Sequence, residues 1–162
     1  MMSARQTMKK GFTLVEILIV VVILGILAAI VIPQFTSASE TAKSSSAVST
    51  LQTIRSQLEL YQVQHNGEYP TLTQMWGNMT AKTNTDGTTT GTPKLGPYLQ
   101  KAPANPFFSG ATSTGVAADS SSGWQYNAAT GEVKLVLPTS ITTSEATDLG
   151  LDTTNDVVVT AS

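Results

Sequence analysis

Apolar residues fall into one long block near the N-terminus, followed by shorter periodic patterns. Residues 12–32 are 21 consecutive positions of which only one, Glu16, is charged. As a helix rising about 1.5 Å per residue, this block is about 31 Å long, close to the roughly 30 Å hydrocarbon core of a bilayer. The pattern therefore predicts a helix that spans a membrane once.

Beyond Pro33 the pattern becomes amphipathic. No Gly or Pro interrupts residues 34–64, and Asn66 and Gly67 then form a suitable C-terminal cap. We predict one long helix from residue 12 to near residue 65, with a bend or break at Pro33. Its apolar stripe recurs at spacings of three and four, at Val48, Leu51, Ile54, Leu58 and Tyr61.

Residues 124–137 carry the pattern of a β-hairpin. Trp124 and Tyr126 alternate with polar residues, residues 127–131 form a turn, and Val133, Leu135 and Leu137 alternate again. The apolar face of this small antiparallel sheet would cover the helical stripe, with Trp124 in the core. The fold class predicted is α+β.

The remaining segments are shorter. A capping box from Thr71 to Gln74 predicts a helix through Met79. Prolines exclude a regular element over residues 96–107. We expect exposed loops over residues 80–94 and 110–123, and a short strand at residues 157–159.

The distribution of basic residues predicts the orientation of the apolar block in the membrane. Three of the nine basic residues, Arg5, Lys9 and Lys10, precede it, and six basic residues against eleven acidic ones remain elsewhere. This asymmetry predicts a cytoplasmic N-terminus with the bulk of the chain across the membrane. No basic patch remains for nucleic acid, and the chain has no cysteine for disulfides or thiolate chemistry.

The apolar block has three interpretations. It is a plain membrane anchor, or a secretory signal peptide with small residues for cleavage at Ala28 and Ala29, although such apolar regions usually hold about 7–15 residues. The third interpretation rests on the stretch KKGFTLVE at residues 9–16. This stretch resembles the N-terminal signal of the type IV pilin and pseudopilin family.

The resemblance implies processing and polymerisation. A membrane-bound prepilin peptidase would cut between Gly11 and Phe12, removing a leader of residues 1–11, and Phe12 would be N-methylated. A lone carboxylate in a membrane helix costs about 2.5–3.5 kcal/mol and normally faces a partner. The resemblance implies that Glu16 meets the Phe12 amine of a neighbouring subunit and sets the register of a helical filament. The alternative is a Glu16 that reaches water at the membrane surface.

Gly25 inside the apolar block and Pro33 just after it are residue types that weaken or interrupt helices. Gly25 weakens a helix by about 1 kcal/mol relative to alanine, and Pro33 removes one backbone donor. Either residue is a kink or a helix end. The resemblance implies that the stretch between them loosens in the assembled filament.

Three later stretches resemble the major pseudopilins of type II secretion systems: NGEYPTLTQMW (residues 66–76), GPYLQKAPANPF (96–107) and GWQYNAATGEVKL (123–135). They imply a pilin fold, with a leader (1–11), a transmembrane and assembly helix (12–33), an amphipathic helix (34–66) and a loop, sheet and tail region (67–162). The implied location is the bacterial inner membrane, crossed once, with a periplasmic C-terminal domain. The implied partners are copies of the same chain, minor pseudopilins, the prepilin peptidase and an inner-membrane assembly platform. The implied function is that of a structural subunit of the type II secretion pseudopilus, which polymerises through its N-terminal helix to drive protein export across the outer membrane. The alternative is a type IV pilus major pilin in adhesion, motility or DNA uptake.

Candidate chemistry is sparse. The only histidine, His65, falls at the predicted helix end as a capping or surface residue, and neither a catalytic triad nor a phosphate-binding loop is recognisable, so we expect no enzyme. Major pseudopilins commonly bind calcium near the C-terminus, and Asp148, Asp152 and Asp156 are candidate ligands. The alternative is that these acids belong to a solvated tail.

Overall fold

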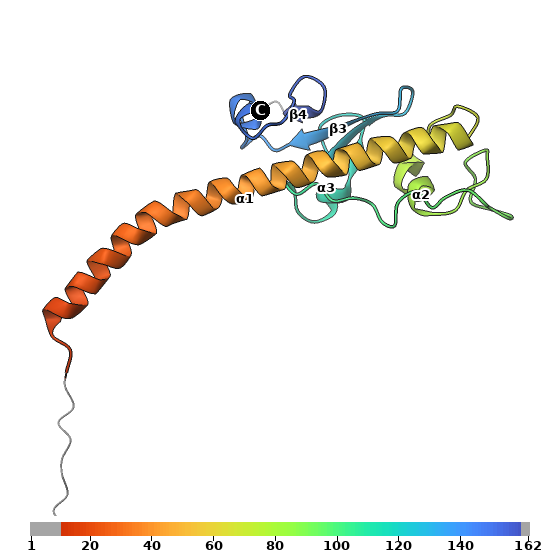
Figure 1. The fold of residues 1–162 in the computed structure, drawn as a ribbon. Helices are drawn as coiled ribbons and strands as arrows, with labels where there is room; N and C mark the ends of the chain where they lie inside the picture. The colour runs from red at the N-terminus through yellow and green to blue at the C-terminus, as the bar shows by residue number, and fades with distance from the viewer. Residues whose placement is uncertain (1–10, 160–162) are drawn as a thin grey trace, which may run out of the picture. The chain divides into compact units, whose positions relative to one another are not determined.

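A computed structural model describes residues 11–159 of the chain (Figure 1). Residues 1–10, which contain most of the predicted leader and its basic residues Arg5, Lys9 and Lys10, lie outside the described residues. The helix α1 (Leu14–Gln64) is followed by short elements: η1 (a 3-10 turn, Leu72–Gln74), α2 (Met75–Thr80), α3 (Ala111–Thr114), β1 (Val116–Ala117), β2 (Trp124–Asn127), β3 (Glu132–Leu137), α4 (Thr143–Asp148) and β4 (Val157–Val159).

Contacts divide the chain into two units, one ending at Ser39 and the other beginning at Glu40. The first unit contains the apolar part of α1. The second contains the rest of α1 and all other elements. This division falls after the boundary that we predicted at residues 33 and 34.

Of the predicted alternatives, a helix end at Gly25 or Pro33 is excluded, because α1 is helical through both residues; a kink at either residue stays a prediction. A proline in a helix removes one backbone hydrogen bond, and the turns on either side retain theirs. Side chains add local bonds just beyond it: the Thr36 hydroxyl donates to the Ile32 carbonyl at 3.2 Å, and the Ser37 hydroxyl to the Pro33 carbonyl at 3.1 Å. Loosening of this stretch in a filament stays a prediction.

The predicted stripe on the second part of α1 faces the core. Leu51, Ile54, Leu58 and Tyr61 are buried, and Ala47 joins them, whereas Val48 is half-buried. The predicted end of the helix is also confirmed. Asn66 and Gly67 have φ angles of 58° and 90°, and the Gly67 N–H donates to the Gln62 carbonyl at 2.9 Å, which closes the last turn.

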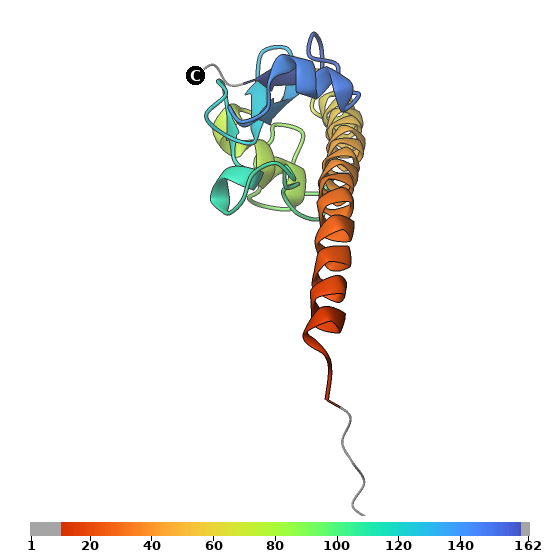
Figure 2. The ribbon, with the colours of Figure 1, turned by 90° about the vertical axis from the view of Figure 1, so that its left-hand side faces the viewer.

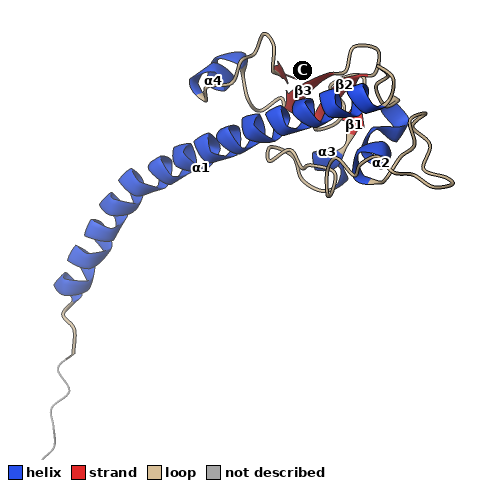
Figure 3. Ribbon diagram, turned by 45° about the vertical axis from the view of Figure 1, so that its right-hand side comes forward, coloured by secondary structure: helices blue, strands red, loops and turns tan. Residues whose placement is uncertain are grey.

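The predicted hairpin is confirmed, but the sheet around it is mixed (Figure 3). β2 and β3 pair antiparallel, with Trp124 opposite Leu135. β1 and β4 pair parallel to the outer edges of this hairpin, in the order β1-β2-β3-β4. The expectation of a purely antiparallel sheet is therefore wrong. One cause is α4, which lies in the connection from β3 to β4 and lets the chain return in the same direction.

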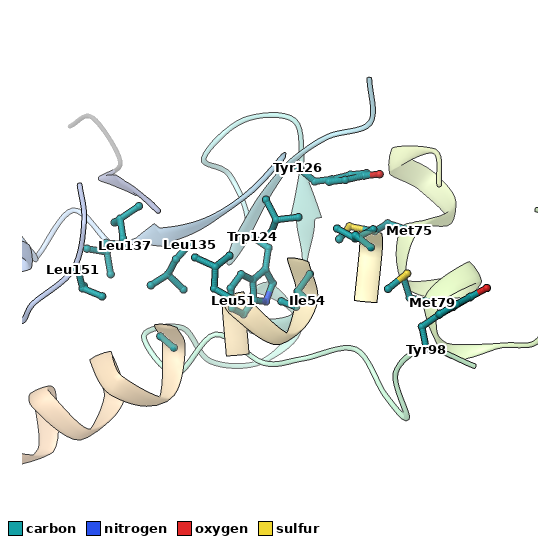
Figure 4. Packing of buried hydrophobic residues seen from close by; sticks show 14 of the residues in the cluster. Leu51, Ile54, Met75, Met79, Tyr98, Trp124, Tyr126, Leu135, Leu137 and Leu151 are labelled. Carbon is teal, nitrogen blue, oxygen red and sulfur yellow. The ribbon is translucent and has the colours of Figure 1, made fainter. Parts of the chain in front are cut away.

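The sheet and the second part of α1 lie side by side in Figures 1 and 2, and the core lies between them. Figure 4 shows Trp124 of β2 beside Leu51 and Ile54 of α1. The Trp124 side chain is fully buried, and its indole N–H donates to the Pro103 carbonyl at 3.0 Å. Trp124 is thus a core residue, as predicted.

Asn105 holds together the proline-rich stretch over residues 96–107, which has no helix or strand, as expected. The Asn105 side chain is fully buried, and its Nδ2 donates to the carbonyls of Gly123 and Val136, both at 2.7 Å. Its Oδ1 accepts from the Phe107 N–H at 2.9 Å. One side chain thereby links the loop to β3 and to Gly123, the residue that immediately precedes β2.

Several local predictions need correction. η1 and α2 occupy the predicted helix of residues 71–79, but the Thr71 hydroxyl bonds the Gln74 side chain at 3.0 Å and caps no backbone group. The loop of residues 110–123 contains α3 and β1. The C-terminal region is no solvated tail, because Ala146, Leu151 and Val157 are core residues.

Candidate assembly segment at the N-terminus

The helix α1 begins with a reciprocal cap between Thr13 and Glu16. The Thr13 N–H and hydroxyl both donate to Oε2 of Glu16 at 2.8 Å, and the Glu16 N–H donates back to the Thr13 hydroxyl oxygen at 3.2 Å. This is the capping box expected from Thr or Ser followed three residues later by Glu. We did not predict it, although Thr13-Leu14-Val15-Glu16 carries its pattern.

The cap fixes where the Glu16 carboxylate lies. A negative charge in the first turn interacts favourably with the partly positive N-terminal end of a helix. Both bonds from Thr13 go to Oε2, so Oε1 remains an acceptor for another donor. The predicted contact with the Phe12 amine is not tested in this chain, because the Phe12 nitrogen is here a peptide nitrogen joined to Gly11.

Large apolar side chains are exposed along the first part of α1 and at Phe12, just before it. From Phe12 to Phe35 their exposed fractions range from 41% to 81%. By length and composition, α1 is long and apolar enough to cross a membrane, with a mean hydropathy of 3.3 in its most apolar 18-residue window. A surface of this kind needs lipid or other apolar chains as its surroundings.

Gly11 and Gly25 are open positions in the described chain. A Cβ built on either residue has no other atom within 4 Å, apart from its chain neighbours and, for Gly25, the nearby helix backbone. Packing within the subunit therefore does not require glycine at these positions. A requirement for a small residue there has to come from another molecule, such as a peptidase at Gly11 or a neighbouring helix at Gly25.

Of the two roles predicted for His65, a capping or a surface residue, the structure excludes the second. The His65 side chain is buried, its Nδ1 lies 2.8 Å from the Tyr61 carbonyl, and its Nε2 lies 2.9 Å from the Thr83 hydroxyl. Its ring stacks on that of Tyr61 with centroids 3.6 Å apart. These contacts give His65 a structural role at the end of α1.

The three candidate calcium ligands do not form a common site. Among residues 11–159 no three His, Asp or Glu side chains form a group that could hold a metal ion. Asp156 instead forms an ion pair with Arg55, and Asp152 accepts hydrogen bonds within its own turn. Asp148 is the last residue of α4 and is exposed.

Comparison with known proteins identifies the family. A protein of Pseudomonas aeruginosa named type II secretion system core protein G is 39% identical over 106 residues, which cover 65% of this chain and 72% of the relative. The chain belongs to the type II secretion system protein G family. The family's own sequence profile matches residues 34–111, and that of the prokaryotic N-terminal methylation motif matches residues 6–32.

Other members of the protein G family agree. The core protein G of Dickeya chrysanthemi is 37% identical over 99 residues, covering 61% of this chain and 63% of the relative. The core protein G of Vibrio cholerae is 35% identical over 98 residues, which cover 60% of this chain and 64% of the relative. The matched part thus spans less than two thirds of these two relatives. No solved structure matches the chain.

The two profiles cover different parts of the molecule. The methylation motif includes Gly11, Phe12, Thr13 and Glu16, so the capped start of α1 lies inside it. The protein G profile covers the second part of α1, η1 and α2, and ends at residue 111. The sheet and the C-terminal elements lie beyond both matches.

Proposed function

We propose that the chain is the structural subunit of a type II secretion pseudopilus and polymerises through its N-terminal helix to drive protein export across the outer membrane. The observation that carries the proposal is the capped start of α1, with Glu16 at the head of an exposed apolar helix, inside a methylation motif. Membership of the protein G family favours secretion over a surface pilus. The subunit is a building block, not a catalyst.

Processing prepares the subunit for this role. Prepilin peptidase cuts between Gly11 and Phe12 on the cytoplasmic side of the inner membrane, and the new Phe12 amine is methylated. The cut leaves the Thr13–Glu16 cap intact, because neither residue is removed. Within the filament, Oε1 of Glu16 accepts a hydrogen bond from the Phe12 amine of a neighbouring subunit. The filament also contains minor pseudopilins and grows from an assembly platform in the inner membrane.

The Glu16→Gln substitution tests the negative charge of Glu16 separately from its role in the helix cap. Glu16→Gln keeps a side-chain oxygen that accepts from the Thr13 N–H, so α1 still begins at the same place, but the negative charge is lost. We expect membrane insertion and cleavage to continue while filament yield in sheared fractions falls at least tenfold. Normal filament yield from Glu16→Gln would show that the charge sets no register.

Two further measurements test the rest of the proposal. Mass spectrometry of the subunit from its own membranes should find a methylated Phe12 as the first residue, and Gly11→Ala should retain the leader. Deleting the gene should stop the release of exported proteins, and the plasmid-borne wild-type gene should restore it. Intact secretion combined with loss of surface fibres would instead support the type IV pilus alternative.

A further inference from the structure

The guanidinium of Arg55 lies where three oxygen atoms from two other segments converge. Nη2 donates to the Val133 carbonyl at 2.8 Å and to the Asn155 carbonyl at 3.3 Å, and Nε donates to the Val133 carbonyl at 3.2 Å. Nη1 pairs with the Asp156 carboxylate. Two carbonyls and a carboxylate are ligand types that Ca²⁺ takes in proteins. Here a side chain of the same chain supplies the positive charge.

The calcium site implied by the resemblance to major pseudopilins does not fit these residues. Both oxygens of the Asp152 carboxylate are used inside the turn: Oδ1 accepts from the N–H groups of Thr154 (2.9 Å) and Asn155 (3.2 Å), and Oδ2 accepts from Asn155 Nδ2 (2.9 Å). The Asp156 carboxylate already faces a cation. A metal ion at this place would lie against the guanidinium and be repelled by it.

We propose that Arg55 takes the place of a metal ion in this chain. Its guanidinium holds the loop of residues 152–156 against β3, so that the C-terminal segment folds and remains folded without calcium. This inference does not depend on the proposed function, because it concerns how the globular unit is held together.

The position of the loop explains why the contact matters. The Leu135 N–H of β3 donates to the Asp156 carbonyl at 2.8 Å, so the residue that pairs with Arg55 also begins the β3–β4 pairing. The Arg55 and Asp156 side chains are only 33% and 27% exposed, which shields the pair partly from solvent. The planar fork of arginine reaches all three oxygens, whereas a lysine ammonium group is a compact point charge on a flexible stem.

The test uses the full chain purified in detergent, with thermal unfolding followed through the fluorescence of its two tryptophans, Trp76 and Trp124, both of which pack in the globular unit. For the unchanged chain we expect the same midpoint with added calcium chloride and with the chelator EGTA. Arg55→Met should lower the midpoint by roughly 5 °C or more. The midpoint of Arg55→Lys should lie between that of the unchanged chain and that of Arg55→Met. Lys43→Met is the matched control, since it removes an exposed charge from the same helix, and should change little.

Three results would overturn the proposal: a midpoint of the unchanged chain that falls with EGTA, one that rises with calcium, or an Arg55→Met midpoint equal to that of Lys43→Met. If Arg55→Met does not fold, Asp156→Asn serves in its place, because it keeps the shape of the side chain and removes the charge. Asp156→Asn should lower the midpoint and open the loop of residues 152–156 to a protease. An Asp156→Asn chain as stable and as resistant as the unchanged one would also overturn it.

Discussion

Replacing Gly131 by alanine should destabilise the globular unit strongly. Gly131 closes the turn between β2 and β3 with a φ angle of 73°, and its N–H donates to the Asn127 carbonyl at 2.8 Å. A Cβ at this position would lie 2.3 Å from both Cε1 and Cζ of Tyr69. The alanine would therefore meet two separate penalties, one in the backbone and one against the ring.

Both penalties can be sized. An L-residue in the left-handed region costs about 1–2 kcal/mol. Overlap of the added methyl group with the Tyr69 ring costs about 1–3 kcal/mol more, because the ring must move by more than an ångström. The sum of about 2–5 kcal/mol corresponds to a fall of roughly 8–20 °C in the melting temperature of a unit of this size, measured by circular dichroism or tryptophan fluorescence.

Other glycines provide matched controls. Gly91 has a φ angle of 85° but open space around a Cβ, so Gly91→Ala should show the backbone penalty alone. Gly77 lies in α2 with neither constraint, so Gly77→Ala should be neutral or stabilising by up to about 1 kcal/mol. In a Tyr69→Ala background, Gly131→Ala should cost no more than Gly91→Ala. If Gly131→Ala costs no more than Gly91→Ala even with Tyr69 in place, the inferred clash with Tyr69 is wrong.

Two further predictions concern pH. Hydrogen bonds from the Thr142 N–H and hydroxyl hold the pKa of Glu145 below its ordinary 4.5, so the stabilisation is complete above pH 4.5 and is lost as the pH falls through the lowered pKa. Melting curves of Glu145→Gln should thus be less acid-sensitive than those of the unchanged chain, and identical acid profiles would contradict this. Burial raises the pKa of Tyr61, Tyr98 and Tyr126 above 10.0, so stability should fall as the pH rises above 10. Ultraviolet titration should show these tyrosines ionising at a higher pH in the folded chain than in urea, and coincident titration curves would contradict this.

Sequence patterns predicted the elements that depend on local periodicity or on turn residues. The stripe on α1, its end at Asn66 and Gly67, the hairpin and the strand of residues 157–159 are all present. Each has a signal within a few residues, because a helix repeats its buried face every three or four positions and a strand every two. The Thr13–Glu16 cap carried such a signal too and was missed because Glu16 was considered only as a charge in a membrane.

Contacts between distant residues were not predictable in this way. Arg55 and Asp156 lie 101 positions apart, and Asn105 bonds the Val136 carbonyl 31 positions away. Nothing in the local pattern distinguishes these polar residues from exposed ones, because only the folded chain brings their partners close. The same holds for His65, whose Nε2 lies 2.9 Å from the hydroxyl of Thr83 in the loop that follows α2.

The exposed apolar length of α1 has a consequence for the energy of assembly. Lipid chains and the side chains of neighbouring helices are similarly apolar, so a subunit that moves from one to the other changes its hydrophobic free energy little. In the proposed pseudopilus, extraction of a subunit from the bilayer and its return would therefore be nearly balanced in free energy. The direction of filament growth would then have to come from polar contacts at the helix end or from mechanical work on the subunit.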